Sequence, residues 1–477
     1  MADRDRHVVL IVIDTARADV FEPYGAQAGS TPALAELART GWAAPHAVAP
    51  SSWTLPSHIG MLLGMPHRQA GLTKPTQARP GLSKPILEAN RSSYLPKVLH
   101  DNGFRTTGAS ANAWVQEGSG FADGFDEFTQ IWDPGHPWLG KQRLVPVEQA
   151  LTAALGRSDH GLRKAAKVAR RWIDQTKQDR KPSFLFLNVM ECHAPYLPPS
   201  PFNGIGPLAR VQAARDMRFT LDMIGVWRAN LAQQLPPPQV LDRMRSLYLG
   251  GVRYTDRWIG EFVRELKRAG LYDDTLILVT SDHGENFGEC GRLSHAFSVD
   301  ERLIHVPLIV ANAATPEPGP VVSLTDVPRM IAAEVGISVH PWHGGASGNQ
   351  VAVSRVEGVG TPDDPDVVKF LADYGIENAV EVMTGDTICA LDGRFKLVRK
   401  ASHEDLFDLS ADPLEQTPVA IASLDAETTE KVTALRAAID AAERGGRDDI
   451  AAAAPTAEAD PDEVRRLEEQ MKLLGYA

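Results

Sequence analysis

The hydrophobic positions of the chain gather in short continuous runs, separated by amphipathic, polar and glycine-containing segments. Four runs are rich in β-branched and large apolar residues. They cover residues 7–13, 183–190, 275–280 and 306–310. Continuous apolar runs of this length are typical of strands buried on both faces of a parallel sheet. We therefore expect a large sheet whose strands lie far apart in the sequence.

Amphipathic segments alternate with these strands. Residues 31–40 predict a helix with Thr31 as its N-cap and Pro32 at the first helical position. Residues 256–267 and 327–335 predict two further helices, each followed by a glycine. Alternating strands and helices predict an α/β fold, in which helices cover both faces of a mostly parallel sheet.

The pattern changes after about residue 345. Residues 388–400 predict a hairpin with Asp392-Gly393 as its two-residue turn, and hence a small antiparallel sheet. The chain after Pro418 is rich in alanine and glutamate and predicts a helical tail, interrupted by an alanine-rich linker at 450–459. We expect a main unit at 1–345, a small α+β subdomain at 346–420 and the tail at 421–477.

Composition and charge narrow the range of possible binding partners. The chain has 477 residues and a formal net charge of −12, so its overall field disfavours nucleic acid and anionic lipid. No apolar run is long enough to span a membrane, and the N-terminal run breaks at Asp14, as expected of a strand and not of a signal peptide. Three cysteines do not make a disulfide framework, and we expect a cytoplasmic protein. An anionic substrate would need a local cation.

Candidate ligands follow three of the predicted strands. Asp14 follows the first strand, Glu191 and His193 follow residues 183–190, and Asp282 and His283 follow residues 275–280. Ligands of parallel α/β sheets bind beyond the carboxyl ends of the strands. A single aspartate at such a place is more often a turn or cap residue. The joint placement of Asp14, Asp282 and His283 instead favours a site for a divalent cation.

Thr54 is the candidate nucleophile. Pro56 predicts the first turn of a helix that ends near Gly64, so Thr54 would lie just before the helix N-terminus. A hydroxyl there faces free backbone N–H groups and the positive end of the helix dipole, where anions bind. The alternative is that Thr54 only caps the helix.

Several segments, taken in order, resemble the sulfatase family of the alkaline-phosphatase superfamily. They are IVIDTARADVFEPYG, TPALAELARTG, TLPSH, NVMECHAPYLPP and TSDHGENFGE. The resemblance implies a three-layer α/β sandwich with a small C-terminal antiparallel sheet.

The resemblance also implies roles for individual residues. Asp14, Asp282 and His283 would hold one divalent metal ion, with Thr54 adjacent to it. His58 would replace the family's signature arginine beside the nucleophile. His193 would contact the substrate, and His295 would lie on the leaving-group side. Further candidates for lining the pocket are Arg17, Asp19 and Asn112.

Two departures from the family pattern shape the expected chemistry. Thr15 stands where many sulfatases have a second aspartate, which favours manganese or zinc over calcium. Thr54 stands where sulfatases carry the cysteine or serine that becomes formylglycine, and threonine cannot form that aldehyde. We therefore expect hydrolysis of a small anionic phosphate ester, phosphodiester or phosphonate. Three alternatives stay open: a sulfatase that works without formylglycine, a phosphoryl-alcohol transferase, and a non-catalytic binding homologue. Homo-oligomer formation is also left open.

Overall fold

The structure is a computed structural model that describes residues 6–65, 83–131, 156, 159–179, 181–220, 223–342, 351–401 and 403–451. Its centre is a seven-stranded sheet of order β2-β11-β7-β1-β6-β4-β5. In that order the strands are Trp42–Ala43, Leu308–Ala311, Thr275–Thr280, His7–Ile13, Ser183–Val189, Arg105–Ser110 and Glu127–Gln130. The strands from β7 to β5 pair in parallel, whereas β11 runs antiparallel to both of its neighbours. The predicted mostly parallel sheet is confirmed.

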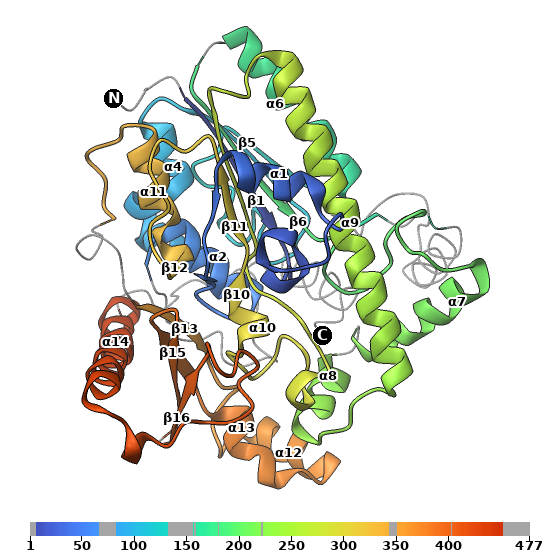
Figure 1. Cartoon of the computed structure of the whole chain (residues 1–477), viewed down its shortest axis with the longest axis vertical. Coiled ribbons are helices and arrows are strands. Elements are labelled where there is room, and N and C mark those ends of the chain that lie inside the picture. Colours follow the sequence, from blue (N-terminus) through green and yellow to red (C-terminus); the bar gives the residue numbers. More distant parts are fainter. Residues whose placement is uncertain are drawn as a thin grey trace.

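Helices cover both faces of this sheet (Figure 1). One face carries α1, α6 and α9, which span Pro32–Thr40, Leu162–Asp179 and Pro238–Ala269, and α7, Pro207–Asp216, packs on α9. The other carries α2, α3, α4 and α11, which span Thr54–Leu63, Lys84–Ala89, Leu95–Asp101 and Val327–Glu334. Alternate residues of β1 enter the two cores: Val9 packs with the first set of helices and Leu10 with the second. The fold is the expected three-layer sandwich.

Smaller elements border the main sheet. A three-stranded sheet of order β10-β3-β12 is made by His305–Val306, Ala47–Val48 and Val322–Ser323, and β8 pairs with β9 at Asn286–Phe287 and Leu293–Ser294. Two short helices, α8 and α10, cover Met223–Leu231 and Glu301–Ile304. Single 3-10 turns lie at Ala18–Val20, Glu22–Tyr24, Arg91–Ser93, Met217–Phe219, Glu289–Gly291, Leu324–Asp326, Glu377–Ala379 and Ile421–Ser423. None of the described helices is apolar over enough of its length to cross a bilayer.

The C-terminal part forms an antiparallel sheet of order β13-β14-β15-β16 (Figure 1, lower left). Its strands are Ala352–Val356, Thr387–Leu391, Phe395–Lys400 and His403–Asp408, and its helices α12, α13 and α14 are Pro365–Tyr374, Val380–Thr384 and Ala426–Ala451. One face packs against α14 through Leu435 and Ile439. The fully buried Lys396 joins this sheet to α10, because its Nζ lies 2.9 Å from Glu301 Oε1.

Two predicted boundaries were wrong, and one predicted side-chain cap is not formed. Helix α9 begins at Pro238 and not near Asp256, because its apolar face continues through Val240 and Met244. The hairpin turn is shifted by one residue: Asp392 N–H donates to Phe395 O, so Gly393 and Arg394 form the turn. Thr31 is an N-cap by position, but its hydroxyl accepts from Glu22 N–H instead of capping α1. The predicted helix after Asp460 and almost all of the linker lie outside the described residues.

Helix α9 approaches the segment that carries His193 very closely. A Cβ on Gly251 would lie 2.1 Å from Glu191 O, and one on Gly250 would lie 2.5 Å from Phe202 O. Only glycine allows the helix backbone to contact these carbonyl oxygens directly. The two glycines therefore set the distance between α9 and the end of β6.

We predict that Gly251→Ala lowers the free energy of unfolding by about 1–3 kcal/mol, because the added methyl group forces these backbones apart. The measurement is urea denaturation of the full chain. Gly206→Ala is the matched control, since no atom lies within 4 Å of its Cβ position. Equal stabilities of the two variants would contradict the close contact.

Candidate active site

Four neighbouring strands deliver polar side chains to one edge of the sheet. Asp14 follows β1, Asp282 and His283 follow β7, His193 follows β6, and Asn112 follows β4. These strands are adjacent in the order β7-β1-β6-β4 and run in parallel, so their carboxyl ends lie together. The sheet order thus brings together residues that are far apart in the sequence.

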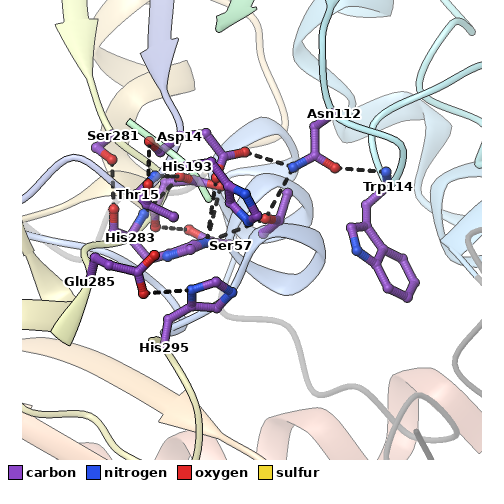
Figure 2. A network of polar contacts seen from close by, with 12 residues as sticks. Asp14, Thr15, Ser57, Asn112, Trp114, His193, Ser281, His283, Glu285 and His295 are labelled. Carbon is purple, nitrogen blue, oxygen red and sulfur yellow. Dashed lines mark hydrogen bonds and ion pairs between the residues drawn. The ribbon is translucent and has the colours of Figure 1, made fainter. Parts of the chain in front are cut away.

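Asp14, Asp282 and His283 form a compact group, of which Figure 2 labels Asp14 and His283. His283 Nε2 lies 3.5 Å from Asp282 Oδ2 and 4.0 Å from Asp14 Oδ1. All three side chains are fully buried. His283 Nδ1 is 3.0 Å from Gly284 O and donates to it, so the lone pair of Nε2 faces the two carboxylates. The three donor atoms are arranged as cation ligands.

The two carboxylates lack a balancing partner. Asp14 Oδ1 and Asp282 Oδ2 are buried atoms that accept no hydrogen bond. Burial and the charge of Asp14 raise the pKa of Asp282 well above its usual range, and burial holds the pKa of His283 well below its own. A divalent cation would neutralise the carboxylates and satisfy both orphaned oxygens. The donor set of two carboxylates and one imidazole fits manganese or zinc.

Thr54 lies beside this group. Its Oγ1 is 3.3 Å from His283 Nε2 and 3.4 Å from Asn112 Nδ2. The predicted start of helix α2 at Pro56 was wrong. The helix begins at Thr54, since Ser57 N–H already donates to Trp53 O. The hydroxyl therefore sits on the first residue of a fully buried helix and not before it. It does not cap the helix, because no side-chain capping bond is present at this end.

Asn112 connects Thr54 to Asp14. Its Nδ2 donates to Asp14 Oδ2 over 2.7 Å, and its Oδ1 accepts from Trp114 N–H (Figure 2). The backbone contact fixes which end of the amide is the donor. Arg17 and Asp19 are also candidates for lining the pocket, but Arg17 forms ion pairs with Asp19 and Glu289.

His58 contacts the backbone of the candidate nucleophile. Its Nδ1 lies 2.9 Å from Thr54 O and 3.4 Å from Asp282 Oδ2, and its Nε2 lies 3.4 Å from Asn188 Nδ2. The ring is fully buried, and this burial lowers its pKa. His58 therefore steadies Thr54 and Asp282 as a neutral imidazole. A neutral imidazole lacks the permanent charge of the arginine that the family resemblance implies for this position.

Two further histidines lie beside His283. The ring centroid of His295 is 4.5 Å from that of His283 and 5.6 Å from that of His193. His193 Nδ1 is 2.7 Å from Ala194 O and donates to it. The structure thus brings His193 and His295 together beside His283 (Figure 2).

Glu285 holds His295, and the sequence reasoning did not assign it a role. His295 Nδ1 lies 3.1 Å from Glu285 Oε1, while the Tyr196 hydroxyl donates to Glu285 Oε2 over 2.7 Å. Burial lowers the pKa of His295, but the charge and hydrogen bond of Glu285 and the charge of Asp14 together raise it above its usual value. The only signal in the sequence is the position of Glu285 two residues after His283.

Two serine hydroxyl groups and a threonine with left-handed backbone dihedrals fix the loops that follow β1 and β7. Ser57 Oγ donates to Asp282 O over 2.6 Å, and Ser281 Oγ bonds both Ile13 O and Ala16 N–H, which ties the end of β7 to that of β1. Thr15 has φ of 57°, and its N–H points to Asp282 Oδ1 at 3.2 Å. A threonine in this conformation is strained, as is common where backbone orients a functional group.

The fold and the site define a class: an α/β sandwich with a buried carboxylate–imidazole cation site beside a hydroxyl at a helix N-terminus, as expected of a metal-dependent ester hydrolase. The sulfatase family model matches residues 6–336. The chain belongs to the sulfatase family.

Individual proteins resemble this chain over only part of its length or at low sequence identity. Choline-sulfatase of Rhizobium meliloti is 35% identical over 189 residues, which cover 37% of this chain and only 33% of that protein. A multifunctional alkaline phosphatase superfamily protein of Trinickia caryophylli is 24% identical over 359 residues, 65% of this chain and 68% of the relative. The solved phosphonate monoester hydrolase from Silicibacter pomeroyi has a TM-score of 0.62 and 20% identity, over 93% of this chain and 96% of its own.

We predict that Asp282→Asn lowers the zinc or manganese content by one equivalent per chain, because the variant removes one of the two charged ligands. The measurement is elemental analysis after gel filtration of metal-saturated protein. Asp273→Asn, which changes an exposed aspartate just before β7, should keep the full content. An unchanged metal content of Asp282→Asn would exclude this group as a cation site.

Proposed function

We propose that the chain hydrolyses a phosphate ester, phosphodiester or phosphonate through a covalent intermediate on Thr54. The proposal rests on one observation above all: the Thr54 hydroxyl lies 3.3 Å from His283 Nε2, next to two buried carboxylates without a cation partner. A hydroxyl in this place can share the cation with Asp14, Asp282 and His283. Its position on the first residue of α2 also places backbone N–H groups beside it, which favour an anionic substrate.

The identity of residue 54 favours phosphorus over sulfur. A formylglycine sulfatase releases sulfate when its hydrated aldehyde collapses, and threonine cannot be oxidised to that aldehyde. An ester on Thr54 has to be cleaved by water at the central atom. This route is open to a phosphorylated threonine.

The proposed reaction has two steps. A bound divalent cation would lower the pKa of the Thr54 hydroxyl and offset negative charge on the substrate. In the first step the Thr54 hydroxyl releases its proton to solvent and Oγ1 forms a bond to phosphorus. The bond from phosphorus to the ester oxygen breaks, and a protonated His295 or His193 donates its proton to that oxygen. In the second step water attacks phosphorus and gives a proton to the histidine that the first step left neutral. The bond to Thr54 Oγ1 breaks, and Oγ1 takes up a proton from solvent, which restores the hydroxyl.

The surrounding residues prepare Thr54 and His295 for these steps. Asn112 donates toward Thr54 Oγ1, and His58 holds the Thr54 carbonyl group, so the hydroxyl is oriented from two sides. Glu285 fixes His295 through Nδ1, which leaves Nε2 as the atom that can reach a leaving group. Both arrangements reduce the motion needed for reaction.

The similar proteins are compatible with this substrate class. The name of the Silicibacter pomeroyi structure gives it phosphonate monoester hydrolysis, although a fold match at 20% identity does not fix the substrate here. The second candidate function is a sulfatase that works without formylglycine. It is favoured by the segment that is 35% identical to choline-sulfatase.

Matched p-nitrophenyl substrates separate these two candidates. We predict faster turnover of the phosphate, phosphodiester or phosphonate than of the sulfate, with manganese or zinc present. Thr54→Ala should lower kcat by at least about 10³-fold, because the nucleophile is lost. Thr54→Ser keeps a hydroxyl and is the matched control that should retain activity. A rapid acid quench followed by mass spectrometry should find phosphate on the peptide that contains Thr54.

The outcomes have distinct meanings. Fastest turnover of the sulfate, still dependent on Thr54, would replace the phosphorus proposal with the sulfatase alternative. Full activity of Thr54→Ala would refute the covalent intermediate.

A second prediction concerns Glu285. Glu285→Gln should lower kcat by about 10²-fold for substrates with an alkyl leaving group, which need a proton from His295. It should have little effect on p-nitrophenyl substrates, whose leaving group needs no proton. Glu289→Gln is the control on the same loop, because Glu289 pairs with Arg17 and not with His295. Equal losses for both leaving groups would show that Glu285 acts only on folding.

A further inference from the structure

A second group of potential ligands lies outside the candidate active site. It consists of His46, Glu301 and His305, whose donor atoms all lie within 4.8 Å of one another. His46 directly precedes β3, Glu301 is the first residue of α10, and His305 is the first residue of β10. Strands β3 and β10 are paired antiparallel, so the group joins three segments at one place.

Both imidazoles approach the same carboxylate oxygen. His46 Nε2 lies 2.9 Å from Glu301 Oε2, and His305 Nδ1 lies 3.9 Å from that atom. The two rings are stacked, with centroids 4.1 Å apart and an interplanar angle of 22°. His46 is 8% exposed, and His305 Nε2 is a buried nitrogen without a hydrogen-bond partner. Two imidazoles and one carboxylate at these distances are a donor set that borderline cations prefer.

Protonation alone explains this arrangement poorly. Stacked rings at this distance cannot both carry charge without strong repulsion. At least one imidazole is therefore neutral and carries a nitrogen lone pair that can bind a cation.

The nearby charges leave room for a cation. Lys396 Nζ lies 2.9 Å from Glu301 Oε1 and 2.7 Å from Glu415 Oε1. One ammonium group thus faces two carboxylates, and it occupies the Glu301 oxygen that points away from the histidines. Glu301 Oε2 stays available on the histidine side.

We infer that His46, Glu301 and His305 form a second cation site, suited to a borderline divalent ion such as Zn²⁺, with the remaining coordination position open to solvent. The quarter-exposed side chain of His305 gives access from outside. The ion would hold β3, α10 and β10 together. Thr54 lies six residues after Val48, the last residue of β3. The carbonyl oxygen of Leu303 in α10 accepts a hydrogen bond from the N–H of Gly284, which follows His283. The site would brace the segments that carry the nucleophile and the histidine ligand.

The test uses Zn²⁺ alone and a full-length background in which Asp14→Asn and Asp282→Asn remove the first cation site. We predict that this background binds one equivalent of zinc, measured by elemental analysis and calorimetry. Adding His305→Gln should weaken the remaining binding by at least about tenfold. Adding His46→Gln as well should abolish it.

His403→Gln is the matched control, since His403 is exposed and pairs with Asp405. Circular dichroism checks that each variant is folded. If the variant with both His46→Gln and His305→Gln does not fold, the variant with His305→Gln alone still tests the site. Cobalt replacing zinc should give visible absorption bands of a tetrahedral site. Zinc that does not bind the background, or that binds equally well after His305→Gln, would overturn the inference in favour of a direct His46–Glu301 contact without a cation. Neither result would bear on the function of Thr54.

Discussion

The burial of two like charges side by side is the constraint on which the site depends. Asp14 and Asp282 are held at the ends of adjacent strands, and each has a buried oxygen without a hydrogen bond. Such a pair is costly in a protein interior unless a cation balances it. The surrounding structure keeps the two carboxylates in place: Ser281 ties the strand ends, Ser57 holds the Asp282 carbonyl, and Thr15 accepts a strained backbone conformation.

The two sheets and their helices supply the rigidity that this constraint needs. β1 and β7 are buried on both faces, so the strand ends cannot move apart to relieve the repulsion. Helix α2, every residue of which is buried, brings Thr54 to the same place from the other layer. The buried contact of Lys396 with Glu301 links the C-terminal sheet to α10. Helix α10 in turn accepts a hydrogen bond from Gly284 N–H through the carbonyl oxygen of Leu303.

Much of this arrangement could be predicted from the chain. The bounds of β1 and β7 follow from continuous apolar runs, and the positions just beyond them identify Asp14, Asp282 and His283. The antiparallel direction of β11 could not be predicted, because apolar runs do not encode strand direction. The bond from Glu285 to His295 and the complete burial of His58 were also missed. They depend on how distant loops fold over the sheet edge, and single residues in loops carry no periodic signal.

The methyl group of Thr54 has a consequence for how the protein matures. Enzymes that rely on formylglycine become active only after a separate enzyme has oxidised the nucleophile. Threonine cannot be oxidised to that aldehyde, so on the proposed mechanism the side chain at this position is complete when translation ends. On the proposed mechanism, activity should not depend on which host cell makes the protein, because no host modification system takes part.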